Sequence, residues 1–260
     1  MTAVTAPRFA PAPSLSRLFA IELRKTIDTR AGFWLLVSTA LAAVVVAAIT
    51  LAAGDHGHDP AFGLFFERTI GTGSIALPVL GILAITSEWS QRTAVTTFAL
   101  LPRRERVIAG KLLAGVAVAL AFVAVCLVIS LAATALVPVI GDGHARWDVA
   151  ATGVAAAVLF IVMWMLAGAA LGLLVMSSAP AIVLSFLIPT GIVGLTTAMP
   201  AADHVLRWID LGTTSGELNA AHPAISAHDW AHLAAGVAVW VLAPLAIGFL
   251  RLRRGEVTSS

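Results

Sequence analysis

Six uninterrupted apolar runs constrain the fold of this chain more than any other feature of its sequence. Each run has about 20 residues or more, the length that an α-helix needs to cross the roughly 30 Å hydrocarbon core of a bilayer. Transmembrane β-strands have about 10 residues and alternate in polarity, so the runs predict helices. The predicted spans are residues 31–53, 62–86, 107–140, 149–176, 181–199 and 230–250.

Composition agrees with this prediction. Hydrophobic residues make up 59% of the 260 residues and charged residues 12%, against about 45–50% and 25% in soluble domains. The fold class is therefore an all-α membrane protein with six transmembrane helices. No polar block within residues 31–250 is long enough to fold separately, so we expect a disordered stretch at 1–13, a single transmembrane domain at 14–250 and a basic tail at 251–260.

The distribution of Lys and Arg predicts the orientation. Of the sixteen such residues, five precede the first span, five lie between the second and third spans and three follow the sixth. The opposite side of an even-span arrangement holds Arg68, Arg146 and Arg207. Because loops rich in Lys and Arg stay in the cytoplasm, both termini are expected to be cytoplasmic.

Residues 14–30, "SLSRLFAIELRKTIDTR", predict an amphipathic helix ahead of the first span. Its apolar and charged residues fall largely on different sides at helical spacing, which is typical of a helix lying in the membrane interface. The apolar side carries Leu15, Leu18, Phe19, Leu23 and Ile27, and the other side carries Arg17, Arg24, Lys25 and Asp28.

The connection between the second and third spans, residues 87–111, is short and basic. Residues 93–101 carry enough apolar residues for a helix at the interface. Pro102 suits the first turn of the following helix, and Glu105 favours the positive end of that helix. The basic residues here can serve only to orient the chain, or they can contact a partner.

A Glu at the end of the second span, Glu88, is followed by Thr93 and by "LLPRRERVIAGK" in a six-span chain. This pattern resembles the permease subunits of type 2 ABC exporters, although Arg92 stands where that family usually has a small Gly. The resemblance implies a cytoplasmic coupling helix between spans 2 and 3 that docks into the ATP-binding subunit. The implied contact residues are Glu88, Arg92, Thr93, Pro102, Arg103, Arg104 and Arg106.

The same resemblance implies an interfacial helix at residues 14–30 and short external helices between spans 5 and 6, in residues 200–229. It also implies that the second and fifth spans line the translocation path. Hydroxyl groups on such helices can instead bond to their own backbone. The candidate path residues are Thr72, Ser74, Ser185, Pro189 and Thr190.

Motifs for catalysis are missing from the sequence. "VIAGKLL" contains Gly-Lys, but Glu105 stands where a phosphate-binding loop needs its first Gly, and Leu112 follows Lys111 instead of Ser or Thr. No Gly-x-Ser-x-Gly or His-Glu-x-x-His motif occurs. We therefore expect no enzyme activity in this chain, which should bind no cofactor itself, with ATP and magnesium bound by a partner ATPase.

The expected function is that of a permease subunit which exports a hydrophobic or amphipathic compound, such as a drug, an antibiotic or a lipid-like molecule, through a bacterial cell membrane. Drug or antibiotic export would confer resistance. The expected partners are a cognate ATP-binding subunit, a second permease copy or paralogue, and membrane lipids, with no nucleic acid. The alternative is a membrane anchor or signalling subunit that binds a cytosolic partner without transport. An ion-coupled carrier is disfavoured, because the spans carry no charge near their middle.

Two further patterns have two interpretations each. In "DHGHD", His56 and His58 with their neighbouring aspartates are donors suited to a divalent metal, or they form an ordinary polar loop. Gly168 and Gly172 form a Gly-x-x-x-Gly step in the fourth span. That step predicts close helix contact, within the chain or across a dimer.

Overall fold

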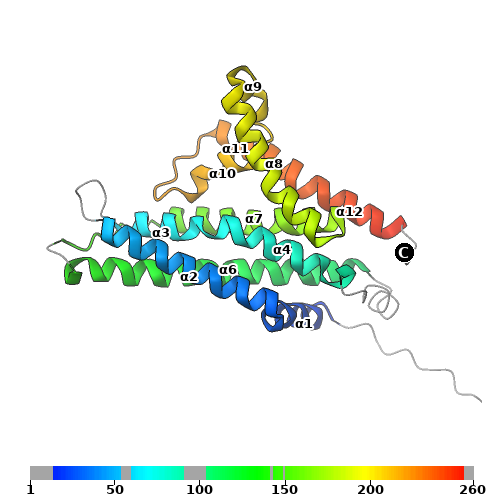
Figure 1. The fold of residues 1–260 in the computed structure, drawn as a ribbon, viewed down its shortest axis with the longest axis horizontal. Helices are drawn as coiled ribbons and strands as arrows, with labels where there is room; N and C mark the ends of the chain where they lie inside the picture. Colours follow the sequence, from blue (N-terminus) through cyan, green and yellow to red (C-terminus); the bar gives the residue numbers. More distant parts are fainter. Residues whose placement is uncertain (1–13, 54–59, 91–103, 141–142, 149, 255–260) are drawn as a thin grey trace, which may run out of the picture.

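The computed structural model describes residues 14–53, 60–90, 104–140, 143–148 and 150–254, and within these ranges the regular elements are all helices. Six segments of the described chain are long and apolar enough to cross a membrane. The prediction of a multi-pass, all-α membrane protein is confirmed. Figure 1 shows the first four spans running alongside one another, while the fifth leaves them at a steep angle.

The helix ends lie within four residues of the predicted span ends. The second and sixth spans each consist of more than one helical element. The spans are α2 (Arg30–Ala53), α3 (Phe62–Gly71) with α4 (Gly73–Ser90), α6 (Arg104–Ile140), α7 (Ala151–Val175), α8 (Ser178–Ala198), and α11 (Ala227–Val237) with the π-helical turn η1 (Ala238–Leu242) and α12 (Ala243–Arg254).

The third span is longer than a bilayer requires. Helix α6 has 37 residues, which at 1.5 Å per residue corresponds to about 55 Å. A straight helix of this length extends beyond a hydrocarbon core of about 30 Å. One end of α6 therefore has room to contact elements outside the apolar layer.

The break in the second span falls at Thr72. Its backbone N–H donates to the Thr69 carbonyl at 3.2 Å, and its hydroxyl donates to the same oxygen at 2.7 Å. At the next residue, a Cβ added to Gly73 would lie 2.5 Å from the ring of Phe122 on α6 and 2.7 Å from Ile161 on α7. Glycine at this position thus lets α4 begin in close contact with both helices.

Helices α4 and α7 approach each other closely in the core. A Cβ on Gly168 of α7 would lie 2.1 Å from the carbonyl oxygen of Pro78, and one on Gly81 of α4 would lie 2.4 Å from that of Met165. Gly172 faces the backbone of Ile82. The Gly-x-x-x-Gly step therefore packs within the chain, which confirms the first of its two interpretations.

Helix α1 (Leu15–Asp28) precedes the first span, as the amphipathic pattern predicted. The Ser14 hydroxyl caps it by accepting the N–H of Arg17 at 3.3 Å. Leu18 is buried against α6, where a Cβ on Gly110 would lie 3.2 Å from the Leu18 Cβ. Figure 1 shows α1 and the C-terminal end of α12 toward the same end of the molecule. We call this the α1 end.

Two short helices connect the fifth and sixth spans, α9 (Pro200–Leu206) and α10 (Leu211–Asn219), as predicted for residues 200–229. Carboxylates of other elements hold the chain around them. The Ala221 N–H donates to Glu67 of α3 at 2.9 Å, and Asp148 accepts the Gly63 N–H at 2.7 Å. His222 lies 3.3 Å from the second oxygen of Asp148.

Helix α8 is attached to the bundle mainly through its first turns. The hydroxyls of Ser178 and Thr86 lie 2.7 Å apart, and Ala181 is fully buried beside Ile82. In the most apolar window of α8 only 11% of the residues are buried, against 56% in α7. The later turns of α8 therefore expose most of their apolar side chains.

Candidate functional site

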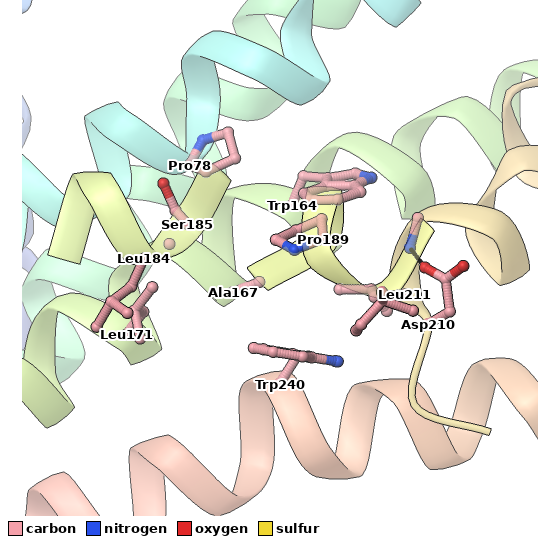
Figure 2. A pocket seen from close by; sticks show the side chains of 13 residues that line it. Pro78, Trp164, Ala167, Leu171, Leu184, Ser185, Pro189, Asp210, Leu211 and Trp240 are labelled. Carbon is pink, nitrogen blue, oxygen red and sulfur yellow. Dashed lines mark hydrogen bonds between the residues drawn. The ribbon is translucent and has the colours of Figure 1, made fainter. Parts of the chain in front are cut away.

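A half-open apolar pocket lies where α8 leaves the bundle. Its walls come from α4, α7, α8, the start of α10 and η1, and it encloses about 480 Å³ with its open side included. Small-molecule sites are typically apolar clefts with a few polar groups. Figure 2 shows the main lining residues, among them Pro78, Trp164, Ala167, Leu171, Leu184, Ser185, Pro189, Leu211 and Trp240.

Two tryptophans form aromatic walls of this pocket, and their N–H groups differ. Trp240 Nε1 donates to the Ile209 carbonyl at 2.6 Å, which ties η1 to the chain two residues before α10. Trp164 Nε1 is buried and has no hydrogen-bond acceptor in the described part of the chain. Buried donors are normally paired. The unpaired indole N–H is therefore the unusual polar group of this pocket.

Asp210 borders the pocket but is fully used in local structure. Its carboxylate caps α10, accepting the N–H groups of Gly212 at 3.0 Å and Thr213 at 3.2 Å and the hydroxyl of Thr213. The side chain is buried, with 4% of the residue exposed. An N-terminal cap explains this buried carboxylate without a ligand.

The predicted path residues are divided between the pocket and other places. Ser185 and Pro189 line the pocket, while Thr190 is exposed on α8. Three of the hydroxyls bond back to their own chain segment, as the alternative interpretation proposed. They are Thr72 to the Thr69 carbonyl at 2.7 Å, Ser74 to Gly71 at 2.8 Å and Ser185 to Ile182 at 2.7 Å.

Sequence reasoning missed Trp164 and Trp240 as pocket residues. Tryptophans of membrane proteins favour the two interfaces, whereas Trp164 is the fourteenth residue of the 25-residue helix α7. A tryptophan in the middle of a span is unusual and indicates a structural or ligand-binding role. This position was the sequence feature from which Trp164 could have been identified. Which side of the span it faces depends on helix packing.

The predicted coupling residues are only partly within the described chain. Arg92, Thr93, Pro102 and Arg103 lie outside the described residues, as do His56 and His58 of the metal candidate. Glu88 belongs to the last turn of α4 and Arg104 is the first residue of α6. Arg106 is half-buried in the first turns of α6. Their role as a docking surface therefore stays a prediction.

Lys111 has a different environment from a surface cation. It is 2% exposed and its ammonium group lies 2.8 Å from the Glu22 carboxylate of α1. The sequence groups Lys111 with the four arginines of the basic connection. The structure places it inside, between α1, α4 and α6.

Among the described residues, no group of three or more His, Cys, Asp or Glu side chains is arranged to hold a metal ion. No protein-family model matches the chain, and neither does any characterised protein sequence. The site must therefore be interpreted from its own geometry.

Proposed function

We propose that this chain is the permease subunit of an ATP-binding-cassette exporter for a hydrophobic or amphipathic compound. The observation that carries the proposal is the apolar pocket beside α8, inside the membrane-spanning part of the chain. Its apolar lining and aromatic walls suit a mainly apolar molecule.

The rest of the chain covers helix α8 poorly. This exposure supports a translocation pathway that one chain does not complete. The helix exposes Val183, Leu187 and Val193, each more than half accessible. In the proposal a second permease, identical or paralogous, lies against this face, and two ATP-binding subunits contact the α1 end. Lipid also covers such a face equally well, so the second permease has to be tested directly.

The α1 end is cytoplasmic in this proposal, because thirteen of the sixteen Lys and Arg residues precede the first span, join the second span to the third or follow the sixth. A bacterial cell membrane is the proposed location. Single cysteines placed at Gly143 and Gly216 should react with a membrane-impermeant maleimide in intact cells, while one at Ser90 should be protected. A reactive Ser90 position would contradict the proposed docking of an ATPase at this end.

Reconstitution tests the function itself. The purified chain alone should not hydrolyse ATP, and vesicles that contain it with its cognate ATPase should move a fluorescent amphipathic dye only when ATP is present. A catalytically inactive ATPase is the control. ATPase binding without any ATP-dependent movement of several such dyes would favour the alternative, a non-transporting membrane anchor.

The basic connection is tested by replacing Arg103, Arg104 and Arg106 together with Lys. If they only orient the chain, the variant should insert and export normally, because the charge is unchanged. If they pair with carboxylates of an ATPase, Lys cannot reproduce the bidentate geometry of the guanidinium group. We expect normal insertion, with at least a tenfold loss of ATPase co-purification. Glu88→Gln should act in the same direction.

A further inference from the structure

A buried charge cluster joins three helices at the α1 end. Lys111 of α6 lies 2.8 Å from one oxygen of Glu22 on α1, and it also donates to the carbonyl of Ala84 on α4 at 2.9 Å. The side chain of Lys111 is 1% exposed and that of Glu22 is 8% exposed. One ammonium group therefore contacts α1 and α4 from a position on α6.

The second oxygen of Glu22 is also paired. Lys25, one turn further along α1, lies 2.9 Å from it, and 49% of the Lys25 side chain is exposed. The carboxylate thus has an exposed cation on one side and a buried cation on the other. Both carboxylate oxygens therefore have an ammonium partner, so the buried carboxylate does not need a water molecule as a hydrogen-bond donor.

Stability alone is a poor explanation for such a pair. Removing two charges from water has a large cost, and replacing a buried ion pair by apolar residues of similar size is often neutral or stabilising. The neighbouring contact of Leu18 with Gly110 shows that apolar packing is already available between α1 and α6. The charged pair adds specificity, because its two groups meet only when α1 has one rotation and one position.

The pair also prevents α1 from leaving by itself. If α1 moved away by itself, the buried Glu22 carboxylate and the buried Lys111 ammonium group would be separated, while Lys111 stayed next to the Ala84 carbonyl. Breaking a buried ion pair is strongly unfavourable. Movement of α1 is therefore linked to movement of the ends of α4 and α6.

We propose that Glu22 and Lys111 are positioning residues for energy coupling, which hold α1 in one register so that α1, α4 and α6 move as a unit. Helix α4 ends at Ser90 and α6 begins at Arg104. The pair thus ties α1 to both helices that border the predicted coupling segment. This inference rests on the proposed function, since it assigns the pair a role in ATP-driven movement.

A cross-link tests the position of α1 without any transport. Cysteines replacing Leu18 and Gly110 would have Cβ atoms about 3.2 Å apart, a few tenths of an ångström below the roughly 3.5–4.5 Å of disulfides, so a small outward shift of α1 would accommodate the bond. In a Cys126→Ala background, this pair should oxidise readily with copper phenanthroline. Adding Glu22→Leu and Lys111→Met should slow the reaction at least tenfold. An unchanged rate would overturn the positioning role.

Transport then tests the coupling role. The Glu22→Leu, Lys111→Met variant should fold and unfold at the wild-type temperature, yet export at least tenfold less dye per ATP hydrolysed. Oxidising the 18–110 cysteine pair in this variant should restore coupling, and reduction should remove it again. Normal coupling in the apolar variant, or failure of the disulfide to restore it, would refute the proposal.

The exposed ion pair on the same helix is the matched control. Arg24 and Asp28 lie 3.2 Å apart with side chains 83% and 63% exposed, so Arg24→Gln with Asp28→Asn should change neither cross-linking nor coupling. If the wild-type chain showed no ATP-dependent export, the proposed function would fail. The cross-linking result would still decide whether the buried pair positions α1.

Discussion

Helices α7 and α8 are consecutive and similar in sequence character, but they have different places in the structure. Both are apolar over their whole length, with 25 and 21 residues. In their most apolar windows, 56% of the α7 residues are buried and 11% of the α8 residues. Hydropathy therefore identifies a span without telling whether it belongs to the core.

Small residues explain part of the difference. Both helices contain glycine pairs, but Gly168 and Gly172 of α7 face the backbone of α4, whereas Cβ atoms on Gly191 and Gly194 of α8 would meet nothing within 4 Å. Lipid is as apolar as a side chain, so spans associate through close packing rather than through the hydrophobic effect. A glycine contributes to packing only where a partner backbone approaches it.

The largest expected effect comes from filling the α7 glycine. In Gly168→Ala the new Cβ would overlap the Pro78 backbone, with 2.1 Å to its oxygen and 2.5 Å to its Cα. Neither atom can rotate away, so we expect a loss of about 3 kcal/mol or more, at the upper end of overpacking effects. Thermal unfolding in mild detergent, followed by size-exclusion chromatography, measures the loss.

Gly191→Ala is the matched control in α8. The new methyl group has open space, and alanine favours a helix over glycine by up to about 1 kcal/mol. The variant should be as stable as the wild type or slightly more stable. Equal destabilisation by both substitutions would mean that α8 is packed as tightly as α7, contrary to the comparison.

The sequence predicted those parts of the fold that depend on hydrophobic length. All six spans were expected from apolar runs and helix α1 from its amphipathic pattern, whereas the two short helices before α11 were implied by the resemblance to exporter permeases. The break at Thr72 was not expected, and the residue beside it, Gly73, lies against Phe122 and Ile161 of other helices. Such contacts join residues far apart in the chain and leave no local pattern.

The candidate site was less predictable for the same reason. Ser185 and Pro189 were chosen from the fifth span and do line the pocket, but Trp164 faces it only because α7 packs on α4 by its glycine side. Lys111 belongs by sequence to a basic connection. Its burial depends on Glu22, which lies 89 residues earlier in the chain.

A second test compares one leucine on each of the two helices. Leu173 of α7 is fully buried, and Leu187 of α8 is 61% exposed. Leu173→Ala should cost about 2 kcal/mol, the lower end of the range for buried leucine, because in lipid the loss is mainly one of packing. Leu187→Ala should cost close to nothing in the isolated chain.

The leucine comparison also addresses the proposed second permease. Unfolding of each variant should be measured at high dilution and after reconstitution at high density. If a second copy covers α8, Leu187→Ala should become destabilising at high density only, while Leu173→Ala stays unchanged. An effect of Leu187→Ala at high dilution would show that α8 is already packed within one chain.

The smallest expected effect separates the two indoles beside α8. Trp240→Phe removes the hydrogen bond to the Ile209 carbonyl and should cost about 1 kcal/mol. Trp164→Phe removes a donor that has no acceptor in the described chain, so stability should stay the same or rise slightly.

Transport should show the opposite order of effects if a ligand accepts a hydrogen bond from Trp164. In that case Trp164→Phe should impair transport more than Trp240→Phe does. We then expect Trp164→Phe to lower the apparent affinity for an acceptor-bearing dye at least fivefold, with no change for a hydrocarbon analogue of the same shape. Equal changes for both dyes would mean that the indole only shapes the wall, and the pocket would then lie between α7 and α8 as a packing defect without polar recognition.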